Sequence, residues 1–400
     1  MSRLRSIQLR LDVLADELIR FWKAHGPDRE HGGFHGWNAR TGSPLPDADK
    51  GLVQQARHLW TFSTWYERRE SKPEVRALAD GLYTFLTACF QDTDGEFVYR
   101  VSRDGKRVVN AQKQLYAESF AIFALSTYAR VFGVDDARRR ALACFRALDA
   151  RLHDDELGGY DQRNDPGWLS PGAEKETNTH LHVLEALTAL SRATEDSLVV
   201  SRLDELVQVM ARRMVQPAGY THKEFFRDFR LHGPPAVSYG HDLETSWLLF
   251  DALAALGTSD AELVASARRL GECSAEWGFD RDAGGYFEEG PPGAAATKLE
   301  KIWWVQAEAV PALWWLYRLS SDRTHLDRLE RTLTWIETRQ RDAEHGEWFW
   351  GILPDGSVGA RGDQKGEEWK ASYHGVRGML FTSDWIAQAL AERSESPRQR

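Results

Sequence analysis

The sequence predicts an all-α fold, an (α/α)6 barrel of twelve helices with short β-hairpins in its loops. Two observations predict it. A short signal in which glycine precedes an aromatic residue recurs 60 to 66 residues apart, at Phe34, Phe97, Tyr160, Tyr220, Tyr286 and Trp348. Between successive signals, apolar residues recur at the three- and four-residue spacing of amphipathic helices, which gives two helices per repeat.

The individual elements follow from this spacing and from local start and stop signals. Asn178 marks a helix start and Gly257 a helix end. Strand patterns are confined to short stretches beside the turns, and residues 96–109 predict a β-hairpin. The predicted helices cover residues 5–25, 50–69, 74–91, 113–131, 136–151, 179–194, 199–214, 241–256, 260–278, 301–320, 323–341 and 374–393.

The arrangement of these helices follows from what each must bury. Six helical hairpins cannot each bury an apolar face alone, whereas two concentric rings of six helices bury all of them. An open solenoid is the alternative, but the signal stops at six copies and no capping repeat is found. No Pro-, Gly- or Ser-rich linker divides the chain, so we expect one catalytic domain over residues 1–393. Residues 394–400 have the composition of a disordered tail.

Composition excludes several classes of partner. A net charge of −9 without a basic stripe argues against nucleic acid. No apolar run approaches the roughly 20 residues that span a bilayer, and the N-terminal segment lacks the apolar core of a signal peptide. Cys89, Cys144 and Cys273 are odd in number and widely separated, as expected for reduced thiols of a cytoplasmic protein. We expect a monomer or a homodimer.

Candidate site residues lie on alternate helices, which are the less polar ones and therefore the predicted inner ring. Polar and aromatic exceptions on these helices would converge on one axis in a closed barrel. Tryptophan, with 16 copies, is common enough to supply platforms for sugar rings. The candidates are Arg57, Tyr116, Asn178, His182, Glu185, His241, Glu244, Trp247, Trp303, Trp304, Glu308, Trp369 and His374.

Two of these helices carry a His-x-x-Glu pair, His182 with Glu185 and His241 with Glu244. Residues three apart share a helix face, and a carboxylate beside an imidazole raises its basicity and fixes its tautomer. A solvated ion pair is the alternative, but recurrence in two repeats favours general-base chemistry. His180 and His182 point about 200° apart on a helix and cannot chelate one ion, so we expect no metal site.

Four segments carry a resemblance to a known family: NTHLHVLEA, GHDLE, KIWWVQAEA and EWKASYH, at residues 178–186, 240–244, 301–309 and 368–374. In this order they resemble the N-acylglucosamine 2-epimerase superfamily, most closely its cellobiose 2-epimerase and mannose 2-epimerase branch. The resemblance covers nearly the whole chain. It implies an (α/α)6 barrel that acts on the reducing-end sugar without a cofactor. The family commonly has proline where this chain has Ser372.

The resemblance also implies roles for individual residues. His241 and His374 look like the two acid/base residues, and Arg57 and His182 look like catalytic ligands of the substrate carbonyl and hydroxyls. Glu244 and Glu308 look like orienting carboxylates. The residues expected to bind the sugar are Tyr116, Asn178, Glu244, Trp247, Trp303, Trp304, Glu308 and Trp369.

The expected function is a sugar 2-epimerase that inverts C2 of an unmodified aldose, or of a reducing-end glucose or mannose unit, through an enediolate. Arg57 would polarise the C1 carbonyl, and two imidazoles would act on opposite faces of the planar intermediate. An aldose–ketose isomerase would use the same groups and return the proton to C1. A glycoside hydrolase would instead use Glu244 and Glu308, and a carbohydrate-binding protein would bind sugars without changing them. The sequence leaves the choice between a monosaccharide and a disaccharide open.

Overall fold

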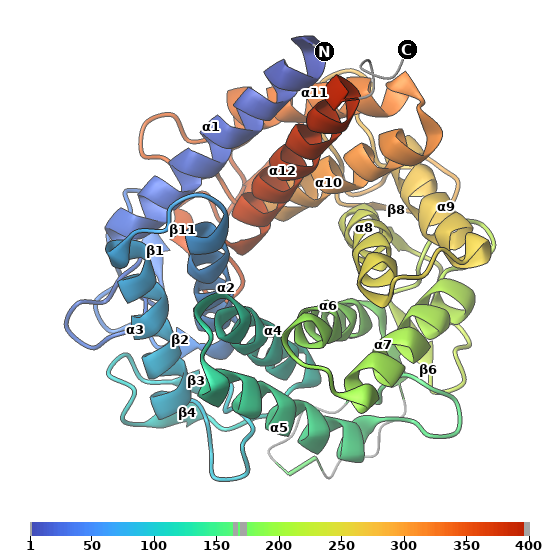
Figure 1. Cartoon of the computed structure of the whole chain (residues 1–400). Helices are drawn as coiled ribbons and strands as arrows, with labels where there is room; N and C mark the ends of the chain where they lie inside the picture. The colour runs from blue at the N-terminus through green and yellow to red at the C-terminus, as the bar shows by residue number, and fades with distance from the viewer. Residues whose placement is uncertain (1, 163–166, 169–173, 396–400) are drawn as a thin grey trace.

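The computed structural model of this chain describes residues 2–162, 167–168 and 174–395. Six inner helices form a ring and six outer helices surround it (Figure 1). The inner helices are α2 (Leu52–Arg68), α4 (Leu115–Phe132), α6 (Thr177–Ala193), α8 (Tyr239–Leu256), α10 (Trp303–Ser320) and α12 (Tyr373–Glu395). The outer helices are α1 (Ser2–His25), α3 (Pro73–Cys89), α5 (Asp135–Leu152), α7 (Ser197–Val209), α9 (Ala261–Trp277) and α11 (Arg323–Trp335).

This arrangement confirms the predicted (α/α)6 barrel. Each inner helix contacts the next, and α12 contacts α2, so the ring closes and the open solenoid is wrong. Helices α7 and α11 end earlier than predicted, because each passes into a π-helical turn, at Met210–Met214 and Ile336–Gln340. Helix α12 runs two residues past its predicted end. Residues 396–400 of the predicted tail lie outside the described residues.

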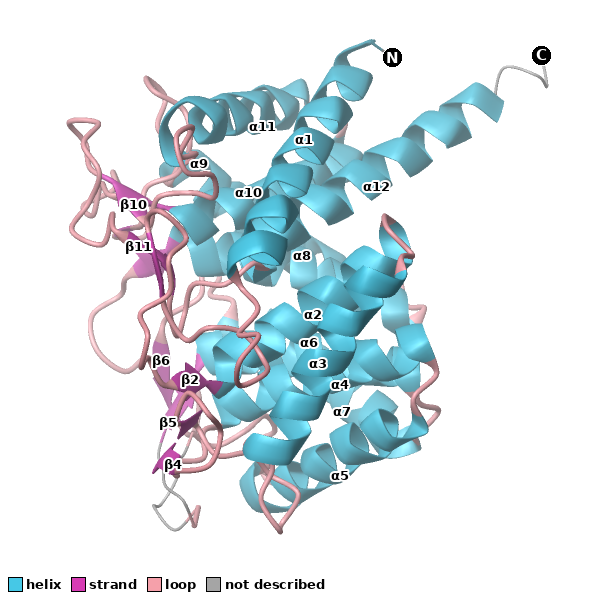
Figure 2. Ribbon diagram, turned by 90° about the vertical axis from the view of Figure 1, so that its left-hand side faces the viewer, coloured by secondary structure: helices cyan, strands magenta, loops and turns pink. Residues whose placement is uncertain are grey.

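The strands are short and gather at one end of the barrel, where the inner helices begin (Figure 2). All pairings are antiparallel: β1–β11, β2–β3–β4, β5–β6, β7–β8 and β9–β10. The predicted hairpin is present as β3 and β4. The strands are β1 (Asn38–Ala39), β2 (Lys50–Gly51), β3 (Arg100–Val101), β4 (Val108–Asn110), β5 (Glu174–Glu176), β6 (Glu224–Phe226), β7 (Val237–Ser238), β8 (Glu289–Gly290), β9 (Lys301–Ile302), β10 (Gly351–Ile352) and β11 (Gln364–Gly366).

The recurring glycine–aromatic signal forms a turn that docks on an inner helix. In the first repeat, the Gln55 side chain of α2 accepts the N–H of Phe34 and donates to its carbonyl. Gly33 has φ of +61°, and a Cβ there would lie 2.8 Å from the Gln55 amide oxygen. A larger residue would therefore be strained and would also displace the docked side chain. The fourth residue of an inner helix accepts the turn's N–H at Gln55, Glu118, His180, Asp242 and Gln306.

Buried ion pairs reinforce the same turns. A lysine two residues before an inner helix, or eight residues before it in the last repeat, reaches an aspartate at the start of the turn, so that an ammonium and a carboxylate neutralise each other. These pairs are Lys50–Asp28, Lys113–Asp92, Lys175–Asp154, Lys301–Asp280 and Lys365–Asp342. His180, one of the two histidines weighed for a metal, is part of this framework, because its Nε2 accepts the N–H of Tyr160 at 3.1 Å.

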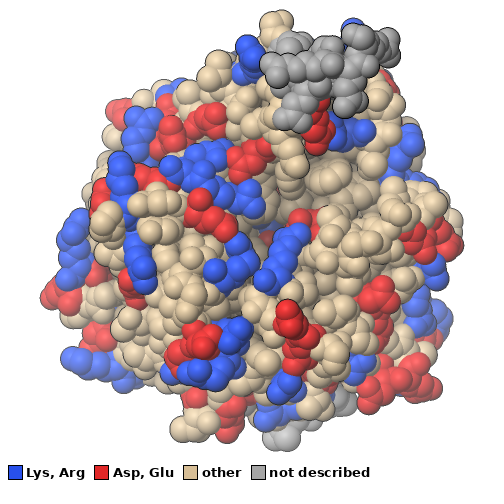
Figure 3. Space-filling model, in the orientation of Figure 1, with Lys and Arg blue, Asp and Glu red and all other residues tan. Residues whose placement is uncertain are grey.

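The opposite end of the barrel, at which the inner helices end, faces the viewer in Figure 1. Its surface carries acidic and basic side chains side by side (Figure 3). Within the described part of the chain, no helix has the length and apolar character needed to cross a bilayer.

Candidate active site

A cavity of about 220 Å³ opens at the end of the barrel where the inner helices begin. Ten of the twelve residues predicted to be catalytic or sugar-binding line it, and Trp350 is an addition. Every repeat contributes, because each inner helix carries lining residues within its first two turns. The lining residues are Arg57, Tyr116, Asn178, His182, His241, Glu244, Trp303, Trp304, Trp350, Trp369 and His374.

His241 and His374 flank the same tryptophan. The ring centroid of His241 lies 4.7 Å from that of Trp304, and the centroid of His374 lies 5.8 Å from it. Gly240 permits this approach, since a Cβ there would lie 2.6 Å from the Trp304 ring. Imidazoles from the fourth and sixth repeats therefore face one pocket with an aromatic platform beside both.

His374 is oriented by a carboxylate. Its Nδ1 lies 2.6 Å from Oε1 of Glu308. Burial and the nearby Arg57 and Arg377 guanidiniums hold the pKa of His374 well below its usual range, so the imidazole is neutral. Because Glu308 accepts the Nδ1 proton, Nε2 keeps its lone pair and can act as a base toward the pocket.

His241 has no comparable partner. Among the residues that the structure describes, it makes neither a hydrogen bond nor an ion pair, so both ring nitrogens are available to a ligand. Burial, His182 and Lys223 lower the pKa of His241 to about 3. The predicted pair of His241 with Glu244 is wrong, because Glu244 turns to Arg377 and lies 3.9 Å from Nδ1 of His374.

The other predicted pair is present. Nδ1 of His182 lies 3.1 Å from Oε2 of Glu185, and the Tyr373 hydroxyl donates to the same carboxylate at 2.5 Å. Burial raises the pKa of Glu185, but Arg377 and the hydrogen bonds outweigh it, and the net pKa is lowered. Glu185 is therefore an anion that holds His182 in its Nδ1–H tautomer. The His182 ring packs against Phe120, 4.5 Å away between centroids.

Arg377 lies about one turn after His374 on α12, and the sequence analysis did not predict it as a site residue. Its fully buried guanidinium bonds to Glu185 and Glu244, and lies 2.7 Å from Glu308. A signal was present in the sequence, because Arg377 follows His374 by three residues and so shares its helix face. One arginine thus holds the carboxylates of three different inner helices.

The carboxylates of Glu244 and Glu308 repel each other. Burial and the Glu308 charge raise the pKa of Glu244 to about 7, and burial raises the pKa of Glu308 as well. The oxygens of Glu244 and Glu308 and a nitrogen of His374 lie close enough to coordinate a cation. The Arg377 guanidinium bonds to both carboxylates, so their negative charge is already paired with a positive side chain.

Trp247 and Glu308 were expected to contact the sugar, but they lie beneath the pocket lining. Trp247 is 1% exposed, and its indole N–H donates to Oε2 of Glu308 at 2.9 Å. Glu308 is completely buried. Neither side chain reaches the pocket. Their contacts suit a supporting role, in which Trp247 holds Glu308 and Glu308 orients His374.

Arg57 forms the cationic wall of the pocket. One of its terminal nitrogens donates to the Tyr116 hydroxyl at 2.9 Å, and the other donates to the backbone carbonyl of Trp369. The guanidinium packs on the Phe120 ring at 4.4 Å. The Trp369 side chain is 38% exposed at the mouth of the pocket. The strand pairing of β9 with β10 brings Trp350 to Trp303, with ring centroids 4.2 Å apart.

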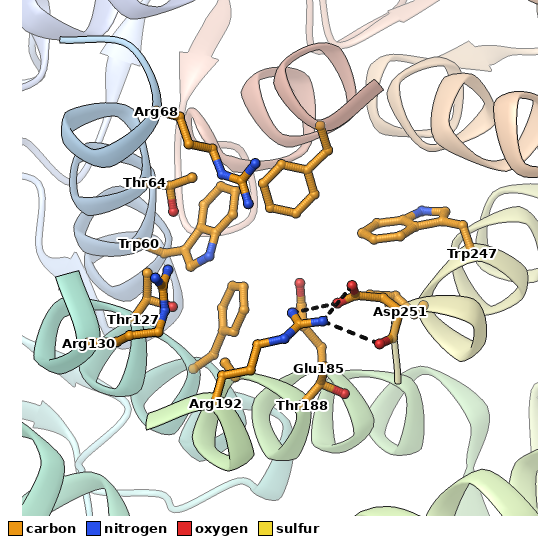
Figure 4. Close-up of a pocket in the computed structure, with 14 residues that line it drawn as sticks. Trp60, Thr64, Arg68, Thr127, Arg130, Glu185, Thr188, Arg192, Trp247 and Asp251 are labelled. Carbon is orange, nitrogen blue, oxygen red and sulfur yellow. Dashed lines mark hydrogen bonds and ion pairs between the residues drawn. The ribbon is translucent and has the colours of Figure 1, made fainter. Parts of the chain in front are cut away.

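A second, smaller cavity of about 50 Å³ lies at the opposite end of the barrel (Figure 4). It has room for a few water molecules and not for a sugar. Its arginines are neutralised: Arg192 lies 2.7 Å from Asp251, and Arg130 bonds to Glu67. The cavity at the end where the strands lie is the larger of the two and is lined by ten of the twelve predicted residues.

Comparisons with known proteins agree with this architecture. The family model of N-acylglucosamine 2-epimerase (GlcNAc 2-epimerase) matches residues 32–377. A cellobiose 2-epimerase of Bacteroides fragilis is 31% identical over 376 residues, covering 91% of this chain and 95% of that protein. The solved cellobiose 2-epimerase of Spirochaeta thermophila aligns with a TM-score of 0.88 and 32% identity, over 97% and 98% of the two chains. A D-mannose isomerase structure, 20% identical over 94% and 97%, shares the fold with a TM-score of 0.86.

Proposed function

The chain belongs to the N-acylglucosamine 2-epimerase family and is a carbohydrate 2-epimerase, and we propose that it inverts C2 of an unmodified aldose or of the reducing-end glucose or mannose unit of a disaccharide. The observation that carries this proposal is the placement of His241 and His374, both beside Trp304 in one pocket. A two-base inversion needs proton-transfer groups that reach one carbon from different sides.

The first step opens the sugar ring. A base takes the proton of the anomeric hydroxyl, the C1–O5 bond breaks, and O5 takes up a proton. His182 suits this exchange, because Glu185 holds its Nδ1 proton and leaves Nε2 free to accept. The product is the open-chain aldehyde, whose carbonyl makes the C2 proton acidic.

The second step inverts C2. His374 takes the C2 proton through Nε2, and the electron pair of the broken C–H bond forms the enediolate. Arg57 stabilises the negative charge on the C1 oxygen. His241, which is neutral in the free protein, takes up a proton from solvent and delivers it to the opposite face of C2, and ring closure gives the epimer. His374 then releases the C2 proton to solvent, so that both imidazoles are neutral again.

A hydrolase mechanism fits the carboxylates less well. Hydrolysis requires two carboxyl groups on either side of the glycosidic bond. Here Glu244 and Glu308 bond to the same nitrogen of Arg377, and Glu308 is buried below the pocket lining. Both carboxylates are committed to holding Arg377 and His374 in place.

Product identification tests the proposed function. The protein is incubated separately with mannose, glucose, cellobiose and lactose, and the products are identified by chromatography and NMR. We expect the C2 epimer of at least one of these sugars. A ketose as the main product would support the isomerase, and release of monosaccharide from cellobiose would support the hydrolase. Four unchanged sugars would contradict the proposal.

We further propose that residues 1–393 act as one catalytic domain in the cytoplasm, as a monomer or homodimer. Cys89, Cys144 and Cys273 are free thiols, which suits a reducing compartment. Light scattering coupled to size-exclusion chromatography measures the mass of the assembly.

A further inference from the structure

The inner ring closes between α2 and α12, the first and last inner helices, and a polar chain crosses this seam. Oγ of Ser372 lies 2.9 Å from Nδ1 of His58 and 2.9 Å from Oγ1 of Thr61. All three side chains are at most 1% exposed. Buried polar groups cost free energy unless they are paired, so the three atoms depend on one another.

The direction of this chain follows from counting protons. The Thr61 hydroxyl donates to the backbone carbonyl of Arg57 at 2.9 Å, so Thr61 can only accept from Ser372. The Ser372 hydroxyl donates its single proton to Thr61. His58 must therefore donate from Nδ1 to Ser372. The chain runs from His58 through Ser372 and Thr61 to the carbonyl of Arg57.

The surroundings of His58 keep this tautomer in place. Its ring is packed between Trp22 and Phe34, with centroids 4.6 and 4.5 Å away, and its buried Nε2 has no hydrogen-bond partner in the part of the chain that the structure describes. Burial and the Arg57 charge lower the pKa of His58 to about 3, so the ring stays neutral over the working pH range. The sequence analysis did not place His58 in the catalytic set, and these contacts fit that choice.

Both ends of the chain lie at residues of the proposed reaction. Ser372 is two residues before His374, and the Arg57 backbone carbonyl belongs to the residue whose side chain forms the cationic wall. The Arg57 guanidinium also lies 5.1 Å from the ring of Tyr373, the residue between Ser372 and His374. We propose that His58, Ser372 and Thr61 are positioning residues that fix Arg57 relative to His374 across the seam of the barrel.

The inference rests on the proposed function, since it concerns the distance between the enediolate-stabilising arginine and the base. An apolar contact would close the seam without the cost of burying three polar groups. A directional hydrogen-bond chain instead fixes the register of one helix against the other, because each hydrogen bond forms only within a narrow range of distance and angle. A shift of α2 along α12 would change the distance between Arg57 and His374 and misplace both side chains relative to the substrate.

Single substitutions along the chain test its role in turnover. Ser372→Ala leaves the Nδ1 proton of His58 without an acceptor, and Thr61→Val breaks the chain at its centre with little change in shape. We expect kcat to fall about 10-fold or more in each, with KM within about twofold. Ser63→Ala is the matched control: Ser63 is fully buried on α2 and, among the described residues, its hydroxyl bonds only to the Leu59 carbonyl of its own helix at 2.8 Å. We expect wild-type kcat for this variant.

Two substitutions at His58 test whether a hydrogen-bond donor at this position is enough to maintain turnover. The His58→Asn amide can donate from nearly the same place as Nδ1, whereas His58→Leu cannot donate. We expect His58→Asn to keep most of kcat and His58→Leu to lose as much as Ser372→Ala. Thermal midpoints are measured for every variant. Midpoints that fall while kcat stays at the wild-type value would show a merely structural chain and overturn the inference.

A measurement without turnover separates the inference from the proposed function. In the ¹⁵N spectrum of histidine-labelled protein, His58→Asn identifies the His58 signals, which we expect to be those of a neutral ring protonated at Nδ1. A ring protonated at Nε2 overturns the chain even if the enzyme epimerises sugars. An enzyme that changes none of the four sugars overturns the proposed function and, with it, the catalytic role of the chain, whatever the spectrum shows.

Discussion

Nδ1 of His374 and Oε1 of Glu308 lie 2.6 Å apart, and they join the last inner helix to the fifth. The other oxygen of the same carboxylate accepts the indole N–H of Trp247. Glu308 is thus held from two sides before it orients the imidazole. This relationship explains how a buried histidine can be neutral, fixed in tautomer and open to the pocket at Nε2.

Arg377→Met should destabilise the protein strongly, because it leaves the buried carboxylates of Glu185, Glu244 and Glu308 without their common cation. Breaking a buried ion pair by removing one partner costs about 3–5 kcal/mol. Urea unfolding gives the free energy of unfolding of both proteins. Arg192→Met is the control, since its pair with Asp251 is partly exposed, and such pairs contribute about 0–1 kcal/mol. Equal losses for the two variants would contradict the account.

Glu118→Gln should stabilise the protein, increasingly so toward high pH. Glu118 caps the N–H of Phe97, and burial raises its pKa from 4.5 to about 8. Above pH 4.5 the unfolded chain loses this proton while the folded protein keeps it, so stability falls as pH rises from 4.5 through 8. Glutamine does not titrate, and Gln55 and Gln306 serve as caps at the equivalent positions.

The stabilisation by Glu118→Gln should be small below pH 4.5 and reach the order of a few kcal/mol above pH 8. Urea unfolding at several pH values measures it. Gln55→Glu is the reverse control and should destabilise the protein over the same pH window. A stability difference that does not change with pH would show that Glu118 is not buried as a neutral acid.

Glu244 should give kcat/KM a rising limb near pH 7. Its pKa is about 7, and its ionisation places a negative charge 3.9 Å from Nδ1 of His374. That charge stabilises the imidazolium that forms when His374 takes the C2 proton, so activity should increase as pH rises through 7. Glu244→Gln should remove this limb, whereas Glu224→Gln, an exposed substitution on β6, should keep it. Profiles of kcat/KM between pH 5 and 9 for the wild type and both variants test this, and a rising limb that persists in Glu244→Gln would contradict the assignment.

Trp369→Ala should distinguish a disaccharide substrate from a monosaccharide. Trp369 is half-buried at the mouth of the pocket, 5.8 Å from Tyr116 between ring centroids. A stacked second sugar would lose contact area worth roughly 1–1.5 kcal/mol, or about 10-fold in KM. We expect this rise for cellobiose and less than about threefold for mannose. Trp277→Ala, similarly exposed on α9, should change neither, and equal effects on both sugars would contradict a second-sugar platform.

Most of the fold could be predicted from the sequence, because the repeat signal has a physical cause. Gly33, Gly159, Gly219 and Gly285 take a positive φ that glycine adopts with little strain, although Glu347 also takes it in the last repeat, so most turn positions are visible in the residue types. The twelve helices follow from apolar spacing between these turns. The π-helical turns after α7 and α11 are not visible in this way, because they change the hydrogen-bond register without changing residue type.

The site was predictable where a side chain points directly to the axis, as His241 and His374 do. It was not predictable where partners come from different helices. Glu244 was expected beside His241 but bonds to Arg377, and this choice depends on the positions of α8 and α12, which local spacing does not contain. Trp247 and Trp304 both lie on inner helices, yet one lies beneath the pocket and the other lines it.

The most direct test is the reaction in D₂O, followed by NMR, for the wild type and for His241→Ala, His374→Ala and the loop control His345→Ala. Proton abstraction and return at C2 should leave one deuterium at C2 of the epimer. Each of the two active-site variants should lose at least 10²-fold in turnover while keeping the wild-type circular dichroism spectrum, and His345→Ala should be fully active. Epimer formed without deuterium at C2, or full activity in either active-site variant, would contradict inversion by two histidines.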